Sequence, residues 1–315
     1  MDGYEENKSV IEDGSLFIGD DVLILGNGFD LDLGLKTSYR DYYNSKYWPF
    51  NNPYTKMGDY LNGERLLNEW MDLEEKLGDY ACNATNFTWV SKRNDKEDYS
   101  QLITGLESYL SKAENGAIKT KSTAAKVLIA YLNSYSIPRI FSFNYTNIYK
   151  IARRLGISTE FSYEHIHGSL ENHNIILGVG ENYKGNAIKL PEDMDFVYKT
   201  SSPNYQPPQM ADVLSNTKHV TFFGLSIGGM DAPYFSGLFQ NLSAQKDKII
   251  TFITYNEESR LQILRHLRNI QSINLNDIWT RHKIEFIRTA SKEDAEKVNE
   301  YIKRLNINPW NLDLP

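Results

Sequence analysis

The amino-acid sequence predicts an α/β protein with a doubly wound, mostly parallel sheet, and three observations lead to that prediction. Short apolar runs recur along the chain, as at residues 22–25, 139–143 and 219–223. Stretches with helical periodicity separate many of these runs. Several runs end directly in glycine or a polar residue, which is typical of strands that lead into a site at the carboxyl edge of a parallel sheet. Apolar strands that alternate with helices favour a sheet covered on both faces.

The first apolar run, residues 22–25, suits a central strand that is buried on both faces. It ends at Gly26, Asn27 and Gly28, where glycine permits a tight turn and leaves room for a ligand close to the backbone. A side chain at position 28 is therefore expected to fill the space of a bound phosphate. Leu31 stands where the dinucleotide-binding fingerprint has its third glycine. A tight turn without a ligand is the alternative interpretation.

The spacing of the elements predicts a core with one insertion. Residues 1–20 form a polar tail, residues 46–135 a mainly helical insertion, and residues 21–45 with 136–315 the core that carries the sheet. After the first run, strands are expected at 139–143, 160–167, 174–179, 219–223, 248–254 and 283–287. Residues 31–44 have room for a helix, which Gly34 and Thr37-Ser38 can break into a turn followed by a short helix. Further helices are expected at 61–77, 99–112, 122–135, 148–155, 233–242, 257–270 and 292–305, and residues 181–215 are expected to form a long loop or small lid.

Composition excludes several classes of function. Hydrophobic residues make up 41% of the 315 residues, enough to bury a sizeable core. The net charge of −7 gives no general attraction to phosphate backbones, so we expect no nucleic-acid partner. No apolar run is long enough to span a membrane, and the first twenty residues lack the pattern of a signal peptide. A single cysteine, Cys82, excludes an internal disulfide and a multi-cysteine zinc site. We expect a cytoplasmic protein.

Asn144 follows the expected strand 139–143 and offers both a donor and an acceptor at the edge of the sheet. The alternative role is to cap the helix that begins near Ile148, for which Asn147 is better placed.

His165 and His167 lie two residues apart in the expected strand 160–167, so strand alternation puts both side chains on one face. Such a pair can bind a metal ion if a third ligand is supplied. Alternatively, His167 stands alone beside Gly168 and acts as a base near neutral pH.

A third strand end, after 219–223, carries Gly224, Ser226 and Asp231. Gly224 and Ser226 are candidates to line the adenosine side of a nucleotide site. Asp231 precedes Pro233, so it is either a binding residue or the cap of the next helix. On the insertion, Glu74 and Glu75 are expected to belong to a solvated helix face.

Taken in order, six motifs resemble the AbiH family of bacterial phage abortive-infection proteins. They are Leu-Gly-Asn-Gly-Phe-Asp at 25–30, Gly-Leu-Lys-Thr-Ser-Tyr at 34–39, Trp-Met-Asp-Leu-Glu at 70–74, Phe-Asn-Tyr-Thr at 143–146, His-Ile-His-Gly at 165–168, and Gly-Leu-Ser at 224–226 with Asp231. The resemblance runs from about residue 21 to residue 240, and its first motif is the most specific.

AbiH proteins in turn resemble sirtuins, NAD-consuming enzymes built on a Rossmann-like sheet. The resemblance implies that the backbone of Gly26, Asn27, Gly28 and Phe29 holds the pyrophosphate. It implies further binding roles for Tyr39, Arg40, Gly168, Gly224, Ser226 and Asp231. Asn144 resembles the asparagine beside the nicotinamide ribose, and His167 resembles the catalytic histidine.

Three departures from sirtuins argue against a protein deacylase. Thr146 stands in place of an aspartate that contacts nicotinamide, and Asp30 in place of a serine. The sirtuin zinc ribbon needs four cysteines, and this chain has one. The groups needed to cleave the glycosidic bond are retained.

The resemblance implies hydrolysis of NAD to nicotinamide and ADP-ribose in phage defence. Asn144 would hold the water or the ribose, His167 would act as the base, and Asp30 would orient the ribose or stabilise positive charge. NAD is then a substrate, and no metal is expected. Two alternatives stay open: a non-catalytic sensor of a nucleotide or ADP-ribose, and a metal-dependent hydrolase that uses His165 and His167. Further partners to consider are a second copy of the chain and a phage-derived activator.

Overall fold

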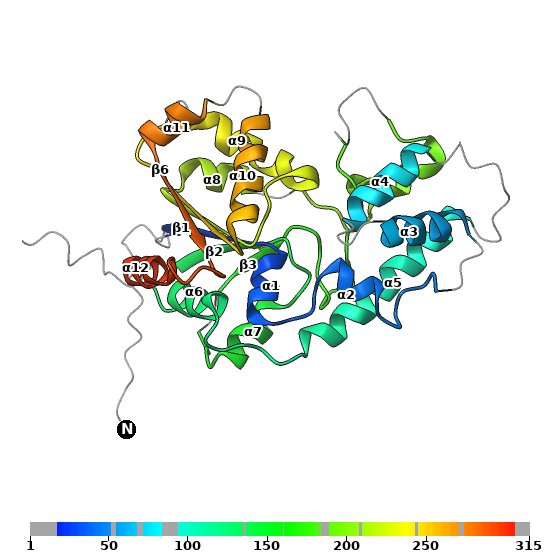
Figure 1. Ribbon diagram of the computed structural model, residues 1–315, viewed down its shortest axis with the longest axis horizontal. Helices are drawn as coiled ribbons and strands as arrows, with labels where there is room; N and C mark the ends of the chain where they lie inside the picture. Colours follow the sequence, from blue (N-terminus) through cyan, green and yellow to red (C-terminus); the bar gives the residue numbers. More distant parts are fainter. Residues whose placement is uncertain are drawn as a thin grey trace, which may run out of the picture.

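The protein is built on a six-stranded, all-parallel sheet with the strand order β3-β2-β1-β4-β5-β6. Figure 1 shows helices on both faces of this sheet. The computed structural model describes residues 18–51, 55–67, 72–83, 94–134, 137–159, 161–181, 183, 189–207, 210–242, 245–270 and 274–305. The strands are β1 (Ile18–Leu25), β2 (Ile137–Ser142), β3 (Tyr163–His165), β4 (His219–Phe223), β5 (Ile249–Thr254) and β6 (Lys283–Arg288). This strand order confirms the predicted doubly wound fold. Strands are added outward on one side from β1 to β3 and on the other side from β4 to β6, so the topology switches between β1 and β4. Such sheets bind ligands at this switch point.

Side chains of β1 alternate between the two faces of the sheet, as expected for a central strand. Leu23 and Leu25 pack into the apolar layer on one face, and Val22 and Ile24 into the layer on the other. The first layer is covered by α1 (Asn27–Leu33), α6 (Thr123–Leu132), α7 (Ile148–Arg154) and α12 (Ala295–Leu305). The second is covered by α8 (Met210–Asn216), α9 (Ala232–Asn241), α10 (Glu257–Asn269) and α11 (Leu275–Arg281).

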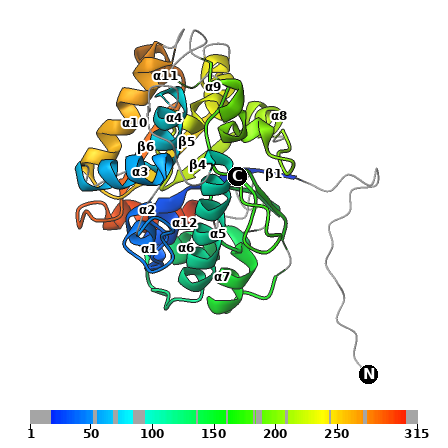
Figure 2. The same cartoon turned by 90° about the vertical axis from the view of Figure 1, so that its right-hand side faces the viewer.

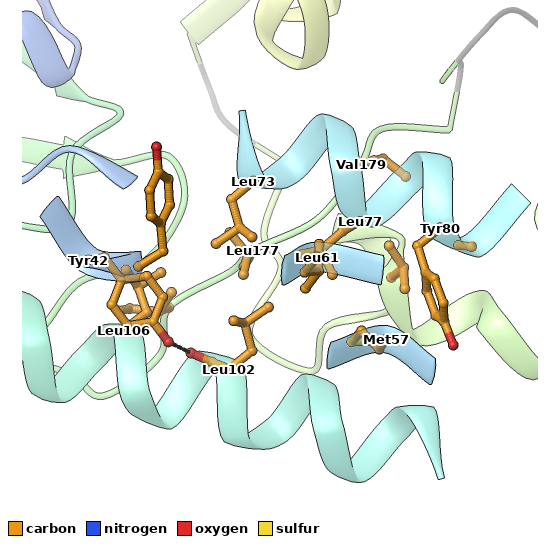
Figure 3. Close-up of a cluster of buried hydrophobic side chains, with 14 of the residues drawn as sticks. Tyr42, Met57, Leu61, Leu73, Leu77, Tyr80, Leu102, Leu106, Leu177 and Val179 are labelled. Atoms are coloured by element: carbon orange, nitrogen blue, oxygen red, sulfur yellow. Dashed lines mark hydrogen bonds between the residues drawn. The ribbon is translucent and has the colours of Figure 1, made fainter. Parts of the chain in front are cut away.

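A further apolar core lies beside the sheet (Figure 1) and forms what we call the helical lobe, which faces the viewer in Figure 2. Its helices are α2 (Tyr39–Tyr43), α3 (Lys56–Leu67), α4 (Leu73–Asn83) and α5 (Asp95–Glu114). Figure 3 shows Leu61, Leu73, Leu77 and Leu102 packed together in this core, with Leu177 and Val179 from a distant part of the chain. The lobe therefore combines most of the predicted insertion with α2 and with residues 170–197.

The helices differ from the sequence-based expectation at several points. The helix expected at 61–77 is two helices, α3 and α4, and Trp70 between them lies outside the described residues. Residues 31–44 break as expected: α1 ends at Leu33 before Gly34, and the short helix α2 begins at Tyr39 after Ser38. Although it lies in the predicted insertion, α6 packs on the sheet against α1 and α12. Helices α8 and α11 were not predicted, and residues 1–17 of the predicted tail lie outside the described residues.

Two predicted strands are wrong in whole or in part. The strand expected at 160–167 is only three residues long and ends at His165, so His167 lies beyond it. Residues 174–179 form no strand, and their one ladder contact is an isolated parallel bridge between Val179 and Tyr198. Around this bridge the chain turns through two 3-10 helices, η2 (Glu192–Val197) and η3 (Lys199–Ser201). The bridge fixes the backbone of Lys199, whose amide donates to the carbonyl of Val179 at 2.9 Å.

Candidate functional site

The residues singled out in the sequence gather at the carboxyl edge of the sheet, on the side where the helical lobe lies. They form three groups: a contact between the loops that follow β1 and β4, a buried group around Asp30, and a buried group around His167. Parallel strands explain this gathering, because all of them deliver their following residues to the same edge.

The loops after β1 and β4 are in direct backbone contact. The amide of Gly26 donates to the carbonyl of Phe223, and the amide of Gly28 to the carbonyl of Gly224, both at 2.9 Å. A β-carbon on Gly28 would come within 2.6 Å of the Cα atom of Gly224, and one on Gly26 within 2.7 Å of the Gly224 carbonyl oxygen. These glycines are needed for the close approach of two backbones, whereas the sequence was interpreted as leaving room for a phosphate.

The backbone amides predicted to hold a pyrophosphate are largely engaged within the protein. Besides Gly26 and Gly28, the amide of Phe29 donates to the carbonyl of Gly26 at 2.9 Å. The Phe29 ring is buried and meets Phe223 edge-on, with 5.4 Å between the ring centroids. Asn27 and Ser226 are exposed beside this contact. The exposed side of the two loops is therefore the surface on which a nucleotide would meet this edge.

Asp30 lies on α1 and is almost fully buried, with 1% of its surface exposed. Its two carboxyl oxygens accept from Asn144 Nδ2 at 3.0 Å and from Thr146 Oγ1 at 2.9 Å. Asn144 Nδ2 also donates to the carbonyl of Gly26 at 3.0 Å. Both amide hydrogens of Asn144 are thus used inside the protein, so the atom that it can offer to a ligand is Oδ1. Asn147, as expected, caps α7 by accepting from the amide of Lys150.

Burial raises the pKa of Asp30 from its ordinary 3.8 to about 7. Removal of the carboxylate from water disfavours its charged form, and the hydrogen bonds from Thr146 and Asn144 oppose this effect only in part. Asp30 therefore exchanges its proton near neutral pH.

His165 and His167 lie in different surroundings. His165 Nδ1 donates to the backbone carbonyl of Asn144 at 2.8 Å, and its ring lies against Tyr163. His165 thus supports the position of Asn144. His167 instead meets the ring of Phe143 edge-on, with 5.2 Å between the centroids, and lies near Tyr234. Among the described residues no group of three or more His, Cys, Asp or Glu side chains is arranged to hold a metal ion.

His167, Lys199, Glu74 and Asp231 form a buried polar group that we call the Lys199 cluster. Lys199 Nζ lies 3.2 Å from His167 Nε2, 3.2 Å from the Glu74 carboxylate and 3.8 Å from Asp231 Oδ1. Asp231 Oδ1 also lies 3.6 Å from His167 Nε2. Glu74 comes from α4 of the helical lobe, Lys199 from η3, and Asp231 from η4 (Gly229–Asp231) before α9. The cluster thus joins the helical lobe to the edge of the sheet.

The protonation states in this cluster are set by burial and by mutual charge. Burial, together with the charge of Lys199, lowers the pKa of His167 well below its usual range, so the imidazole is neutral. Burial raises the pKa of Glu74 to about 7 and that of Asp231 to about 6, and Lys199 opposes both increases. Carboxyl groups with pKa values this close to neutrality are typical of acid–base sites.

Two members of this cluster, Glu74 and Lys199, were not predicted from the sequence as site residues. Glu74 is 8% exposed, so the prediction that it belongs to a solvated face is wrong, although its neighbour Glu75 is exposed. The signal was available, because Glu74 falls on the helical stripe that carries the buried Leu73 and Leu77. Lys199 lies in an irregular segment with no local pattern, and only the bridge to Val179 places it. Asp231 precedes α9, yet its side chain makes no capping hydrogen bond.

The remaining predicted binding residues lie at varying distances from these groups. The side chains of Tyr39 and Tyr145 are hydrogen-bonded to each other. Burial raises the pKa of both tyrosines, and the negative charge of Glu74 raises it further. Arg40 is exposed on α2. Gly168 has a φ of +77°, and a β-carbon there would come within 2.0 Å of the Asn174 carbonyl oxygen. Glycine at 168 thus serves a tight backbone turn directly after His167.

Comparison with known protein families places this geometry in context. The family model described as bacteriophage abortive infection AbiH matches residues 22–255, more than half of the chain. The chain belongs to the AbiH family. Membership of AbiH implies a role in bacteriophage abortive infection. The AbiH match contains all residues of the Asp30 group and the Lys199 cluster.

A search of curated proteins finds no match. Within the described part of the chain, each helix is too short or too polar to cross a bilayer.

Proposed function

We propose that this AbiH protein acts in abortive infection by hydrolysing the bond between nicotinamide and ribose in NAD, with NAD as a substrate and no metal ion. The observation that carries the proposal is the Lys199 cluster: a neutral imidazole, an amine and two carboxyl groups, buried together at the carboxyl edge of a parallel sheet. Groups of this kind are costly to bury, and they are found at sites that transfer protons.

The chemistry needs few groups. Nicotinamide leaves as a neutral molecule, so the leaving group needs no acid. The site must hold the ribose, position a water molecule and accept one of its protons. Asn144 Oδ1 is the group that would contact the ribose or the water, and Asp30 beside it would hold Asn144 in place. The base would come from the cluster around His167.

The likeness of these motifs to sirtuins supports NAD as the substrate. The nucleotide would lie over the exposed side of Asn27 and Ser226, next to the contact between Gly28 and Gly224. The packing of Gly26 and Gly28 against Gly224 would shape that surface.

The test is nicotinamide release by the purified protein, together with NAD levels in phage-infected cells that express it. We expect His167→Ala and Asn144→Ala each to reduce the rate by ~10²–10⁴-fold, through loss of proton transfer or of positioning. The double variant should be little worse than the poorer single variant, because groups that serve one transition state do not contribute additively.

Two histidine variants serve as controls. His173→Ala removes a side chain that is 78% exposed and should leave both rate and melting temperature unchanged. His165→Ala should lower the melting temperature more than the rate, because His165 supports the backbone of Asn144. Full activity in folded His167→Ala protein would refute the mechanism. Binding of NAD without release of nicotinamide would instead favour a nucleotide sensor.

A further inference from the structure

His167 is poorly placed to accept a proton, although it is the histidine at the edge of the sheet. Its Nε2 atom lies 3.2 Å from Lys199 Nζ. An ammonium group can only donate, so Nε2 is the acceptor in this contact and its lone pair is occupied. Protonation of Nε2 would break the contact and place a second positive charge beside Lys199, in surroundings that screen charges poorly. The proton must go to another group.

The two carboxyl groups of the cluster outnumber its one ammonium group. Lys199 Nζ lies 3.2 Å from Glu74 and 3.8 Å from Asp231, and the charges of the two carboxylates act on each other. Two carboxylates that share one counter-charge in a buried site cannot both ionise readily. Each negative charge therefore favours a proton on the other carboxyl group.

Asp231 is the carboxyl group with acceptor capacity to spare. Glu74 accepts from Lys199 at 3.2 Å and from the amide of Gly178 at 3.4 Å. Asp231 Oδ1 is buried and accepts no hydrogen bond from any described residue, since 3.6 Å to His167 and 3.8 Å to Lys199 are too long. The Asp231 side chain is also 18% exposed, against 11% for Glu74, so it is the more accessible of the two.

We propose that Asp231 accepts the proton of the attacking water, and that Glu74, contributed by the helical lobe, is the neighbouring carboxylate whose negative charge strengthens the binding of this proton. Lys199 is a positioning residue whose charge favours the ionised form of Asp231, and His167 is a positioning residue that holds Lys199. This inference rests on the proposed hydrolysis of NAD and assigns the base within that same site.

The step balances without a further reactant. The water oxygen forms a bond to C1′ of the ribose, and one water proton passes to the Asp231 carboxylate. The bond between C1′ and the nicotinamide nitrogen breaks, and its electron pair neutralises the pyridinium. Asp231 then releases the proton to solvent.

The rate should depend on pH through the cluster as a whole. The charged and titratable groups that face Asp231 and Glu74 are Asp72 before α4, Lys199, His167, Tyr39 on α2, Tyr99 on α5, Tyr145 after β2, and Tyr234 on α9. Burial raises the pKa of each of these tyrosines, so they stay neutral across the range of interest. A base with a pKa of about 6 loses its activity as the pH falls through that value.

The first experiment compares pH–rate profiles of nicotinamide release. Asp231→Asn should lose ~10²–10⁴-fold in rate and the dependence on pH below neutrality. Glu74→Gln should move the acid limb of the profile to lower pH, because a neutral partner no longer opposes ionisation of Asp231. His167→Gln should lower the rate yet keep the acid limb. Matched controls are Asp212→Asn and Glu75→Gln, which change exposed carboxylates.

Opposite outcomes overturn the assignment. If His167→Gln abolishes the acid limb while Asp231→Asn keeps it, His167 is the base. If the wild-type protein releases no nicotinamide in vitro or in infected cells, NAD hydrolysis is refuted as the function. The assignment of Asp231 as the base of that reaction is then refuted as well.

A second experiment tests the carboxyl pair without turnover. Side-chain carboxyl carbons can be followed by NMR in protein labelled at Asp and Glu, with Asp231→Asn used to assign the Asp231 signal. We expect this signal to titrate well above the ordinary range and to move to lower pH in Glu74→Gln. An identical titration in the wild type and in Glu74→Gln would show that the two carboxyl groups are not coupled.

Discussion

Burial raises the pKa of Asp30 as it raises those of Glu74 and Asp231, but without the opposing charge of Lys199. No described cation contacts Asp30, and its partners are neutral donors, the amide of Asn144 and the hydroxyl of Thr146. Burial therefore dominates, and its pKa rises to about 7. In the unfolded chain the same group titrates near 3.8. The folded state consequently retains a proton that the unfolded state has lost between these two values.

This difference makes stability depend on pH. Because the folded state binds more protons, the free energy of unfolding should fall as the pH rises from about 4 to about 7, by ~1.4 kcal/mol for each unit of pKa shift. Asp30→Asn cannot ionise, and the Thr146 hydroxyl can rotate to accept from the new amide. We expect the variant to lack this part of the pH dependence in urea denaturation, and exposed Asp59→Asn to retain it. Parallel curves for wild type and Asp30→Asn would contradict the raised pKa.

Residue roles were predictable from the sequence only where local pattern and topology agree. Asn144 and His167 follow apolar runs, and a parallel sheet brings such residues to one edge. Their partners depend on contacts between distant segments. Lys199 reaches the cluster through a bridge to Val179, and Glu74 through the packing of α4, and neither contact leaves a motif in the sequence.

At the scale of elements, the buried parallel strands were the most predictable part of the fold. Strand β4 begins and ends as predicted, and β5 and β6 differ by one residue at one end. Continuous apolar runs mark strands that are covered on both faces. The edge strand β3 was predicted too long, and residues 174–179 were mistaken for a strand because their apolar side chains pack mainly into the helical lobe.

The contact between the loops after β1 and β4 leads to a prediction about Gly28. Gly28→Ala would bring a β-carbon within 2.6 Å of the Gly224 backbone, so we expect a loss of ~1–3 kcal/mol in the free energy of unfolding. Gly63→Ala is the control, since α3 has open space at that position and alanine favours helix by ~0.5–1 kcal/mol. Urea denaturation measures both. A neutral effect at position 28 would show that the two loops can separate, as a phosphate between them would require.

At the scale of the whole molecule, the helical lobe has a core of its own. Leu77 is fully buried there, so Leu77→Ala should cost ~2–5 kcal/mol. Leu66 on α3 is 85% exposed, and Leu66→Ala should change stability by less than ~0.5 kcal/mol. Hydrogen exchange should show the loss of protection from Leu77→Ala in α2–α5 and in residues 170–197, with β1, β4 and β5 little affected. Equal loss throughout the chain would mean that lobe and sheet unfold as one unit.

The origin of the Lys199 cluster in two cores has a consequence for how the site can change in evolution. Glu74 is encoded in the first third of the chain, and Lys199 and Asp231 in the second half, so recombination between them separates Glu74 from the other two residues. A chimera that combines the helical lobe of one relative with the sheet of another should fold if each core is intact. It should nevertheless lose the contact between Glu74 and Lys199. Compensating changes at positions 74, 199 and 231 should therefore be inherited together.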